Sequence, residues 1–279
     1  MERSSRAVTI AAVAAVGVVI GGVLAPSASA AGVTLRAPSS FGIGPGAVMS
    51  TQIDARTASL CTADFVFRGP NALYIGMSAH CAGTGRSEDP SGCTAPTLPL
   101  GTEVTISGRG GPESTGRLAY SSWVTMQERG EDDPALCRYN DFALVAVDPA
   151  DAGLVDPSVP LLGGPTGLDT DGLTPGETVY SFQPNNGGSG VKTGRSVADD
   201  GSGRSHQVVI TPPGVPGDSG SGFLDADGRA VGVLSTEFLD RNHGNGVADL
   251  ALALAYADAD GGLGTVTLVP GTAPFRSVG

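Results

Sequence analysis

Short stretches of β-forming residues, each ended by a glycine- or proline-containing turn, run through most of this chain. Of its 279 residues, 43 are glycine and 20 are proline. Residues 61–67 show the pattern, because the turn sequence RGPN at 68–71 ends them and a second stretch, 72–77, follows. Strands of this length, with no ten-residue helical pattern between them, predict antiparallel sandwiches or barrels and argue against a parallel βαβ sheet.

The same pattern recurs further along the chain. We expect strands at 102–107, 117–126, 142–147, 178–182, 207–211, 222–224 and 230–236. The one convincing helix comes last, at 247–257, where Leu250, Leu254 and Ala257 fall on one face.

The first thirty residues have the order of a secretory signal peptide. Arg3 and Arg6 precede an apolar run at 7–25, and Ala28-Ser29-Ala30 follows as a cleavage site. The alternative is an uncleaved anchor, since nineteen apolar residues are just long enough to span a bilayer. We expect cleavage after Ala30 and a secreted, extracellular protein that is free of the membrane.

The exported part divides by composition into segments. We predict a short leader at 31–45, a first β domain at 46–150, a Pro- and Gly-rich linker at 151–165, a second β domain with the terminal helix at 166–260, and a flexible tail at 261–279. The formal net charge of −12 argues against nucleic-acid binding and is typical of a solvated secreted surface.

All four cysteines lie in the exported part, which favours two disulfides in an oxidising compartment. They lack the C-x-x-C spacing of a zinc site. Three pairings are open, and we favour Cys61 with Cys81 and Cys93 with Cys137. The first of these would close a loop of about twenty residues and stabilise the fold by roughly 3 kcal/mol.

Of the three histidines, His80 is the candidate for catalysis, since it ends the run at 75–80 and precedes Cys81. The alternative is a structural histidine at a strand end, and we expect His206 and His243 to be structural. Among the acids, Asp141 lies directly before the apolar stretch 142–147, which draws its carboxylate toward the core. A buried carboxylate needs a partner such as an imidazole N–H, although a cap at the strand entrance is the alternative.

The segment GVPGDSGSG at 214–222 places Ser219 between glycines. Gly217 and Gly220 allow a backbone that presents the hydroxyl outward, and the N–H groups of Gly217 and Ser219 would be oxyanion donors. A tight loop without chemistry is the alternative, because so short a motif arises by chance in a glycine-rich chain.

Three segments together resemble the signature regions of the chymotrypsin-like serine peptidases, particularly their secreted bacterial branch. They are SAHC at 78–81, NDFALV at 140–145 and PGDSGS at 216–221, in that family's order of His, Asp and Ser. The resemblance implies an all-β fold of two antiparallel six-stranded β-barrels with a C-terminal helix. His80 and Asp141 would lie in the N-terminal barrel and Ser219 in the C-terminal barrel.

The resemblance also implies a serine endopeptidase that hydrolyses protein or peptide substrates. Ser219 would attack the scissile carbonyl, His80 would take its proton, and Asp141 would hold His80 in the correct tautomer. The disulfide between Cys61 and Cys81 would clamp the histidine loop. We expect a monomer that needs no cofactor and no metal.

The match to the family is weaker at two features, the cation that pairs with Asp218 and the substrate pocket. Asp218 matches the acid that pairs with a new N-terminal amine in animal members and with an arginine in bacterial ones, and Arg195 is our candidate for that arginine. At the base of the substrate pocket, where an acid would select Lys or Arg, the chain has Pro213. In place of Ser-Trp-Gly, the pocket wall has Ser235, Thr236 and Glu237. The Glu237 carboxylate would narrow the pocket or favour a cation, unless it points to solvent.

Three other interpretations stay open as alternatives. An esterase of the α/β-hydrolase type needs G-x-S-x-G and the order Ser, Asp, His, which this chain lacks. A catalytically inactive peptidase fold could serve as a binding module. The DADG segment at 225–228 lacks the spaced glutamate of an EF-hand loop, and we expect a hairpin turn there.

Overall fold

A computed structural model describes residues 42–85, 91–238 and 244–278. The predicted signal peptide, most of the predicted leader, and His243 lie outside these residues. The end of the leader is packed, because Ile43 is buried and its N–H donates to the carbonyl of Leu154. Within the described part of the chain, no helix is long and apolar enough to cross a membrane.

The N-terminal strands and β14 form one eight-stranded sheet in the order β14-β3-β4-β7-β6-β5-β1-β2. Its strands are β1 (Val48–Gln52), β2 (Ala58–Thr62), β3 (Val66–Arg68), β4 (Leu73–Met77), β5 (Glu103–Ser107), β6 (Glu113–Ser121), β7 (Ala143–Val147) and β14 (Thr267–Leu268). All of these pairs are antiparallel. The sheet exceeds the predicted six strands partly because β14 arrives from the C-terminal end and pairs with β3.

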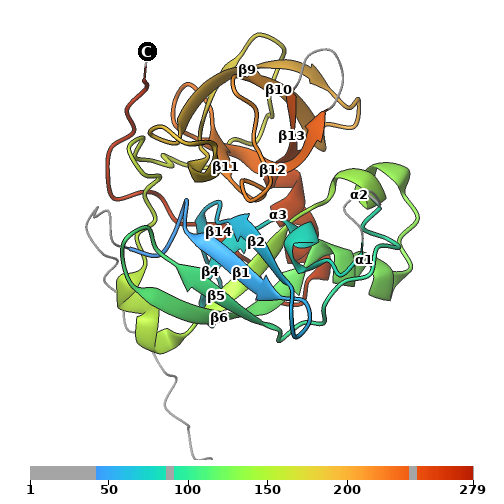
Figure 1. Cartoon of the computed structure of the whole chain (residues 1–279). Helices are drawn as coiled ribbons and strands as arrows, with labels where there is room; N and C mark the ends of the chain where they lie inside the picture. The colour runs from blue at the N-terminus through green and yellow to red at the C-terminus, as the bar shows by residue number, and fades with distance from the viewer. Residues whose placement is uncertain (1–41, 86–90, 239–243, 279) are drawn as a thin grey trace, which may run out of the picture. The chain divides into compact units, whose positions relative to one another are not determined.

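The C-terminal strands close into a six-stranded barrel in the order β10-β13-β12-β11-β8-β9. These strands are β8 (Thr178–Phe182), β9 (Val191–Asp199), β10 (Ser205–Ile210), β11 (Gly222–Leu224), β12 (Ala230–Phe238) and β13 (Gly244–Asp249). Figure 1 shows β1, β5 and β6 of the eight-stranded sheet in the part of the molecule below the barrel strands β9, β10 and β13. Alternate residues of β9 are buried, as expected for a strand with one face toward the barrel interior. A closed barrel leaves no sheet edge unpaired.

The helices differ from the sequence prediction. The expected strand at 117–126 ends at Ser121, where α1 (Ser122–Arg129) begins, and α2 (Pro134–Tyr139) follows. Short 3-10 turns occur at η1 (Ala79–Ala82), η2 (Pro149–Leu154) and η3 (Pro184–Asn186). The predicted terminal helix is present as α3 (Leu250–Asp260), three residues later than expected, because β13 takes the residues up to Asp249.

The residues after α3 do not form the predicted flexible tail. Beyond β14, the N–H of Gly271 donates to the carbonyl of Pro165 and that of Arg276 to the carbonyl of Leu162. The Phe275 ring packs edge-on against Tyr180, with 5.6 Å between centroids. These contacts tie the end of the described chain to the linker and to the barrel.

Both favoured disulfides are confirmed. Cys61 is joined to Cys81, and Cys93 to Cys137. The first links β2 to η1 next to His80, and the second links the loop after η1 to α2. The histidine loop and the helix before Asp141 are thus each fixed by a covalent cross-link.

Candidate active site

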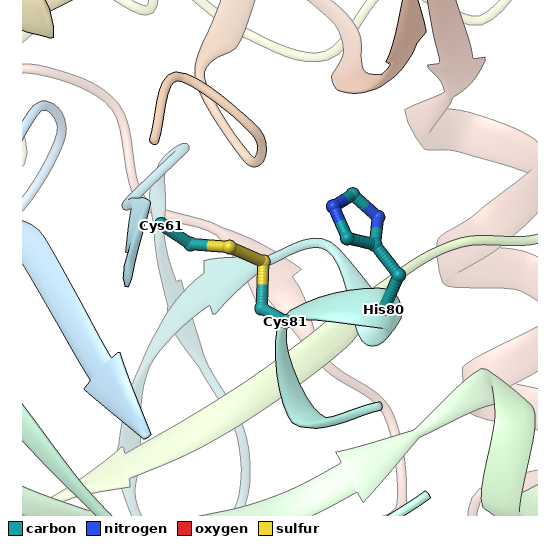
Figure 2. A group of neighbouring side chains, drawn as sticks. All are labelled: Cys61, His80 and Cys81. Carbon is teal, nitrogen blue, oxygen red and sulfur yellow. A yellow bond between two sulfur atoms is a disulfide. The ribbon is translucent and has the colours of Figure 1, made fainter. Parts of the chain in front are cut away.

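His80 lies on η1, directly after the fully buried strand β4. Its neighbour Cys81 forms the disulfide with Cys61, and Figure 2 shows the two sulfur atoms joined beside the histidine. Cys61, His80 and Cys81 also form a compact group of the kind that can bind a metal. Cysteine binds metals as a thiolate, so the disulfide removes both sulfurs as ligands.

The side chain of Asp141 makes two contacts with His80. Its Oδ2 lies 2.7 Å from Nδ1 of the ring, and its Oδ1 accepts a 2.8 Å hydrogen bond from the His80 backbone N–H. This bidentate contact fixes the ring and directs its other nitrogen, Nε2, away from the carboxylate. The predicted pairing of these two residues is present in the structure.

The turn that carries Asp141 is held by Ser122 at the start of α1. The Ser122 hydroxyl donates to the carbonyl of Asn140 at 2.6 Å and accepts from the N–H of Phe142 at 3.1 Å. Both neighbours of Asp141 are therefore anchored by one side chain. Asp141 is 4% exposed, so its carboxylate needs the partners it has.

A third contact to the Asp141 carboxylate comes from the C-terminal barrel. The Ser235 hydroxyl donates to Oδ2 of Asp141 at 2.6 Å. The pairing of β12 with β13 shifts register between Leu234 and Thr236, which leaves Ser235 in a bulge. A bulge turns a side chain out of the regular alternation, and here it directs Ser235 to Asp141.

The contacts between Asp141 and His80 shift the pKa values of these two side chains in opposite directions. Burial would raise the pKa of Asp141, but the His80 charge and the hydrogen bonds from His80 and Ser235 hold it below its usual value. Burial would lower the pKa of His80, but the charge of Asp141 and its hydrogen bond raise it above 6.5. The arrangement therefore keeps Asp141 ionised and makes the His80 ring a stronger base.

The backbone of the loop that carries Ser219 packs against the end of β2 and against Ser78, just before η1. The Ser219 carbonyl accepts from the N–H of Thr62 at 2.8 Å. The next residue, Gly220, has φ +91°, and a Cβ there would lie 2.2 Å from the Thr62 carbonyl oxygen and 3.3 Å from the Ser78 nitrogen. Only glycine fits this close approach, which brings the Ser219 loop into contact with Ser78, two residues before His80.

The backbone N–H groups of Gly217 and Ser219 have no hydrogen-bond partner among the described residues. Gly217 has φ +98°, a conformation that favours glycine. Ser219 is half-buried, and its hydroxyl makes no hydrogen bond to His80 within the described part of the structure. The structure thus joins His80 and Asp141 directly and places the Ser219 loop beside them.

Asp218 does not pair with Arg195. The Arg195 guanidinium is exposed and donates to the carbonyl of Gly176 at 2.8 Å. Asp218 is fully buried and accepts hydrogen bonds from the backbone and side-chain nitrogens of Asn185 at 2.9 and 3.0 Å. The prediction that Arg195 pairs with Asp218 was wrong, because the Arg195 side chain lies on the outer, exposed face of β9.

The predicted pocket residues take different positions. The Ser235 hydroxyl contacts Asp141, as described above, whereas Thr236 is exposed and Pro213 is half-buried. The backbone of Glu237 pairs with Asn245, and its side chain lies outside the described residues. A Cβ on Gly214 would lie 2.7 Å from the Leu234 side chain, so that side chain already fills the space next to Gly214.

A cavity of about 820 Å³ lies apart from these residues. Its lining includes Arg109, Leu161 and Phe182, and none of His80, Asp141 and Ser219. The expected structural role of His206 agrees with its burial in the barrel, where Nε2 lies 3.1 Å from Oδ2 of Asp249.

Sequence reasoning missed several residues around the site. Asn185 had no local signal, because its partner Asp218 lies 33 positions further along the chain. Trp123 of α1, whose ring centroid is 6.5 Å from that of His80, was assigned to a strand. Lys192 had one signal, since it is the single lysine of the sequence.

Solved structures of proteases resemble this chain. Thermobifida fusca protease A matches with a TM-score of 0.51 at 18% identity, covering 82% of this chain and 99% of its own. A Nocardiopsis protease matches with a TM-score of 0.47 at 14% identity, covering 81% of this chain and 98% of its own. No protein-family model matches the sequence, and no match is found among curated proteins.

The chain shares the mostly antiparallel β fold of Thermobifida fusca protease A, with one closed six-stranded barrel and a second, eight-stranded sheet where a second six-stranded barrel was predicted, which confirms the all-β fold class. At 18% identity the likeness establishes the fold, and function is a property of the site.

Proposed function

We propose that this chain is a secreted serine endopeptidase that hydrolyses peptide bonds through an acyl-enzyme intermediate. The hydrogen bond between Nδ1 of His80 and Oδ2 of Asp141 carries the proposal, because it leaves Nε2 as the free base of an oriented ring. The Ser219 loop beside it, with two backbone N–H groups available, supplies a nucleophile and an oxyanion site.

In the first half of the proposed reaction, Ser219 Oγ attacks the substrate carbonyl carbon while Nε2 of His80 takes the hydroxyl proton. The carbonyl oxygen becomes an oxyanion that accepts hydrogen bonds from the N–H groups of Gly217 and Ser219. The tetrahedral intermediate then collapses, the C–N bond breaks, and the imidazolium gives its proton to the leaving amine. Asp141 stays ionised and stabilises the imidazolium.

In the second half, water attacks the acyl carbon and His80 takes a proton from it. Collapse of this intermediate releases the carboxylic acid and returns the proton to Ser219. Removing one oxyanion donor in enzymes of this type costs about 10²–10³ in rate, so the two backbone N–H groups are a major part of the proposed chemistry.

The cellular setting belongs to the same proposal. The order of residues 1–30 favours export, and both disulfides suit an oxidising compartment outside the cytosol. We propose that the exported protein acts as a monomer on protein or peptide substrates.

Labelling with a fluorophosphonate tests whether Ser219 is activated. We expect intact mass analysis of residues 31–279 to show a single adduct, which peptide mapping places on Ser219. The adduct should be absent from Ser219→Ala and strongly slowed in His80→Ala. Ser221→Ala is the matched control, because it removes the second serine of the same motif and should be labelled like the parent. A folded parent that stays unlabelled would favour the inactive binding module.

A further inference from the structure

Lys192 is the most buried cation near the nucleophile loop. It lies on the barrel-facing side of β9, and the residue is 7% exposed. A buried ammonium is costly unless it is paired or hydrogen-bonded, so its position needs a reason. Arg195, three residues further along the same strand, stays exposed on the opposite face.

The ammonium holds the beginning of the loop that leads to Ser219. Its Nζ donates to the carbonyl of Pro212 at 3.0 Å. Two further hydrogen bonds fix the residues that follow: the N–H of Gly214 donates to Oδ1 of Asn245 at 3.0 Å, and that of Val215 to Oδ2 of Asp218 at 3.1 Å. The loop is therefore tied down just before Gly217.

Asp218 is the charged group that acts on Lys192. Its carboxylate is fully buried directly before Ser219, and three nitrogen donors from Asn185 and Val215 hold it. Burial lowers the pKa of Lys192, and the charge of Asp218 opposes this effect.

We propose that Lys192 is a positioning residue for the oxyanion site. Its ammonium balances the Asp218 carboxylate and holds the Pro212 carbonyl, and the loop then keeps the N–H groups of Gly217 and Ser219 in place. The inference rests on the proposed peptidase function. Because lysine loses its charge at alkaline pH and arginine keeps it, Lys192 contributes an alkaline loss of activity that arginine at this position would not.

The test compares Lys192→Met and Lys192→Arg with the parent in kcat/KM across pH, using a chromogenic peptide substrate that the parent cleaves. We expect Lys192→Met to lose at least about tenfold in kcat, with a smaller change in KM, because the defect lies in the transition state. Lys192→Arg should keep most of the activity at neutral pH, and its alkaline limb should move to higher pH than that of the parent.

Arg195→Met is the matched control, since it removes a cation from the outer face of the same strand. It should match the parent in kcat and in pH profile. An unchanged kcat in Lys192→Met, or an alkaline limb in Lys192→Arg that overlays the parent's, would overturn the inference. If Lys192→Met fails to fold, the pH profile of kcat/KM for Lys192→Arg alone decides whether the inference stands. A parent that neither cleaves peptides nor reacts with the fluorophosphonate refutes the proposed function itself.

Discussion

The Ser235 hydroxyl donates a 2.6 Å hydrogen bond to Oδ2 of Asp141, the same carboxylate oxygen that faces Nδ1 of His80. This contact joins the C-terminal barrel to His80 and Asp141, the two candidate site residues that come from the N-terminal part of the fold. The Asp141 carboxylate is thus held from both halves of the molecule, and its geometry depends on how they meet.

Replacing Ser235 with alanine removes this contact. A hydrogen bond to a charged group contributes about 1.5–3 kcal/mol, so we expect Ser235→Ala to lower kcat/KM by roughly ten- to a hundredfold. Ser235→Thr keeps a hydroxyl and should retain most of the activity. Steady-state kinetics on a peptide substrate measure both. Equal losses in the two variants would show that packing at this position matters rather than the hydrogen bond.

The pH dependence of activity follows from His80. The ring must be neutral to accept the Ser219 proton, and Asp141 raises the pKa of His80 above 6.5 against the opposing effect of burial. Activity should therefore fall as the pH drops through a value above 6.5. A profile of kcat/KM against pH reports this pKa in the free enzyme. An acid limb at or below pH 6.5 would contradict the described electrostatics.

Gly220 is predicted to tolerate no side chain. Gly220 and Gly101 have similar backbone angles, φ +91° and +86°, but a Cβ would overlap the Thr62 carbonyl at Gly220 and meet nothing within 4 Å at Gly101. The left-handed backbone costs each alanine about 1–2 kcal/mol, and the overlap adds a further 1–3 kcal/mol at Gly220. Urea unfolding of Gly220→Ala and Gly101→Ala measures the difference. Equal destabilisation would refute the close packing of the Ser219 loop against Thr62.

The parts of this structure that sequence could predict are those with local signals. The strands at 178–182 and 222–224 agree with β8 and β11 residue by residue, because turn residues flank each of them. The three signature segments were recognisable because each residue that matters lies inside a short motif. His80 and Asp141 then met as expected, since a buried carboxylate needs a donor.

Other features depend on contacts between distant segments. The run at 117–126 contains no glycine or proline, so the change from β6 to α1 at Ser122 is set by tertiary packing, including the Ser122 contacts to Asn140 and Phe142. The direction of Ser235 depends on a bulge formed with β13. The burial of Lys192, and the exposure of Arg195 on the same strand, depend on which face of β9 lines the barrel.

The most direct test of the proposed function is a digestion of an unstructured protein such as casein, followed by mass spectrometry of the products. We predict that purified residues 31–279 generate new peptide ends, and that Ser219→Ala and His80→Ala, with both disulfides intact and an unchanged unfolding transition, generate almost none. A parent that binds but does not cleave, or a Ser219→Ala variant that cleaves at the parent's rate, would contradict the assignment of this chain as a serine endopeptidase.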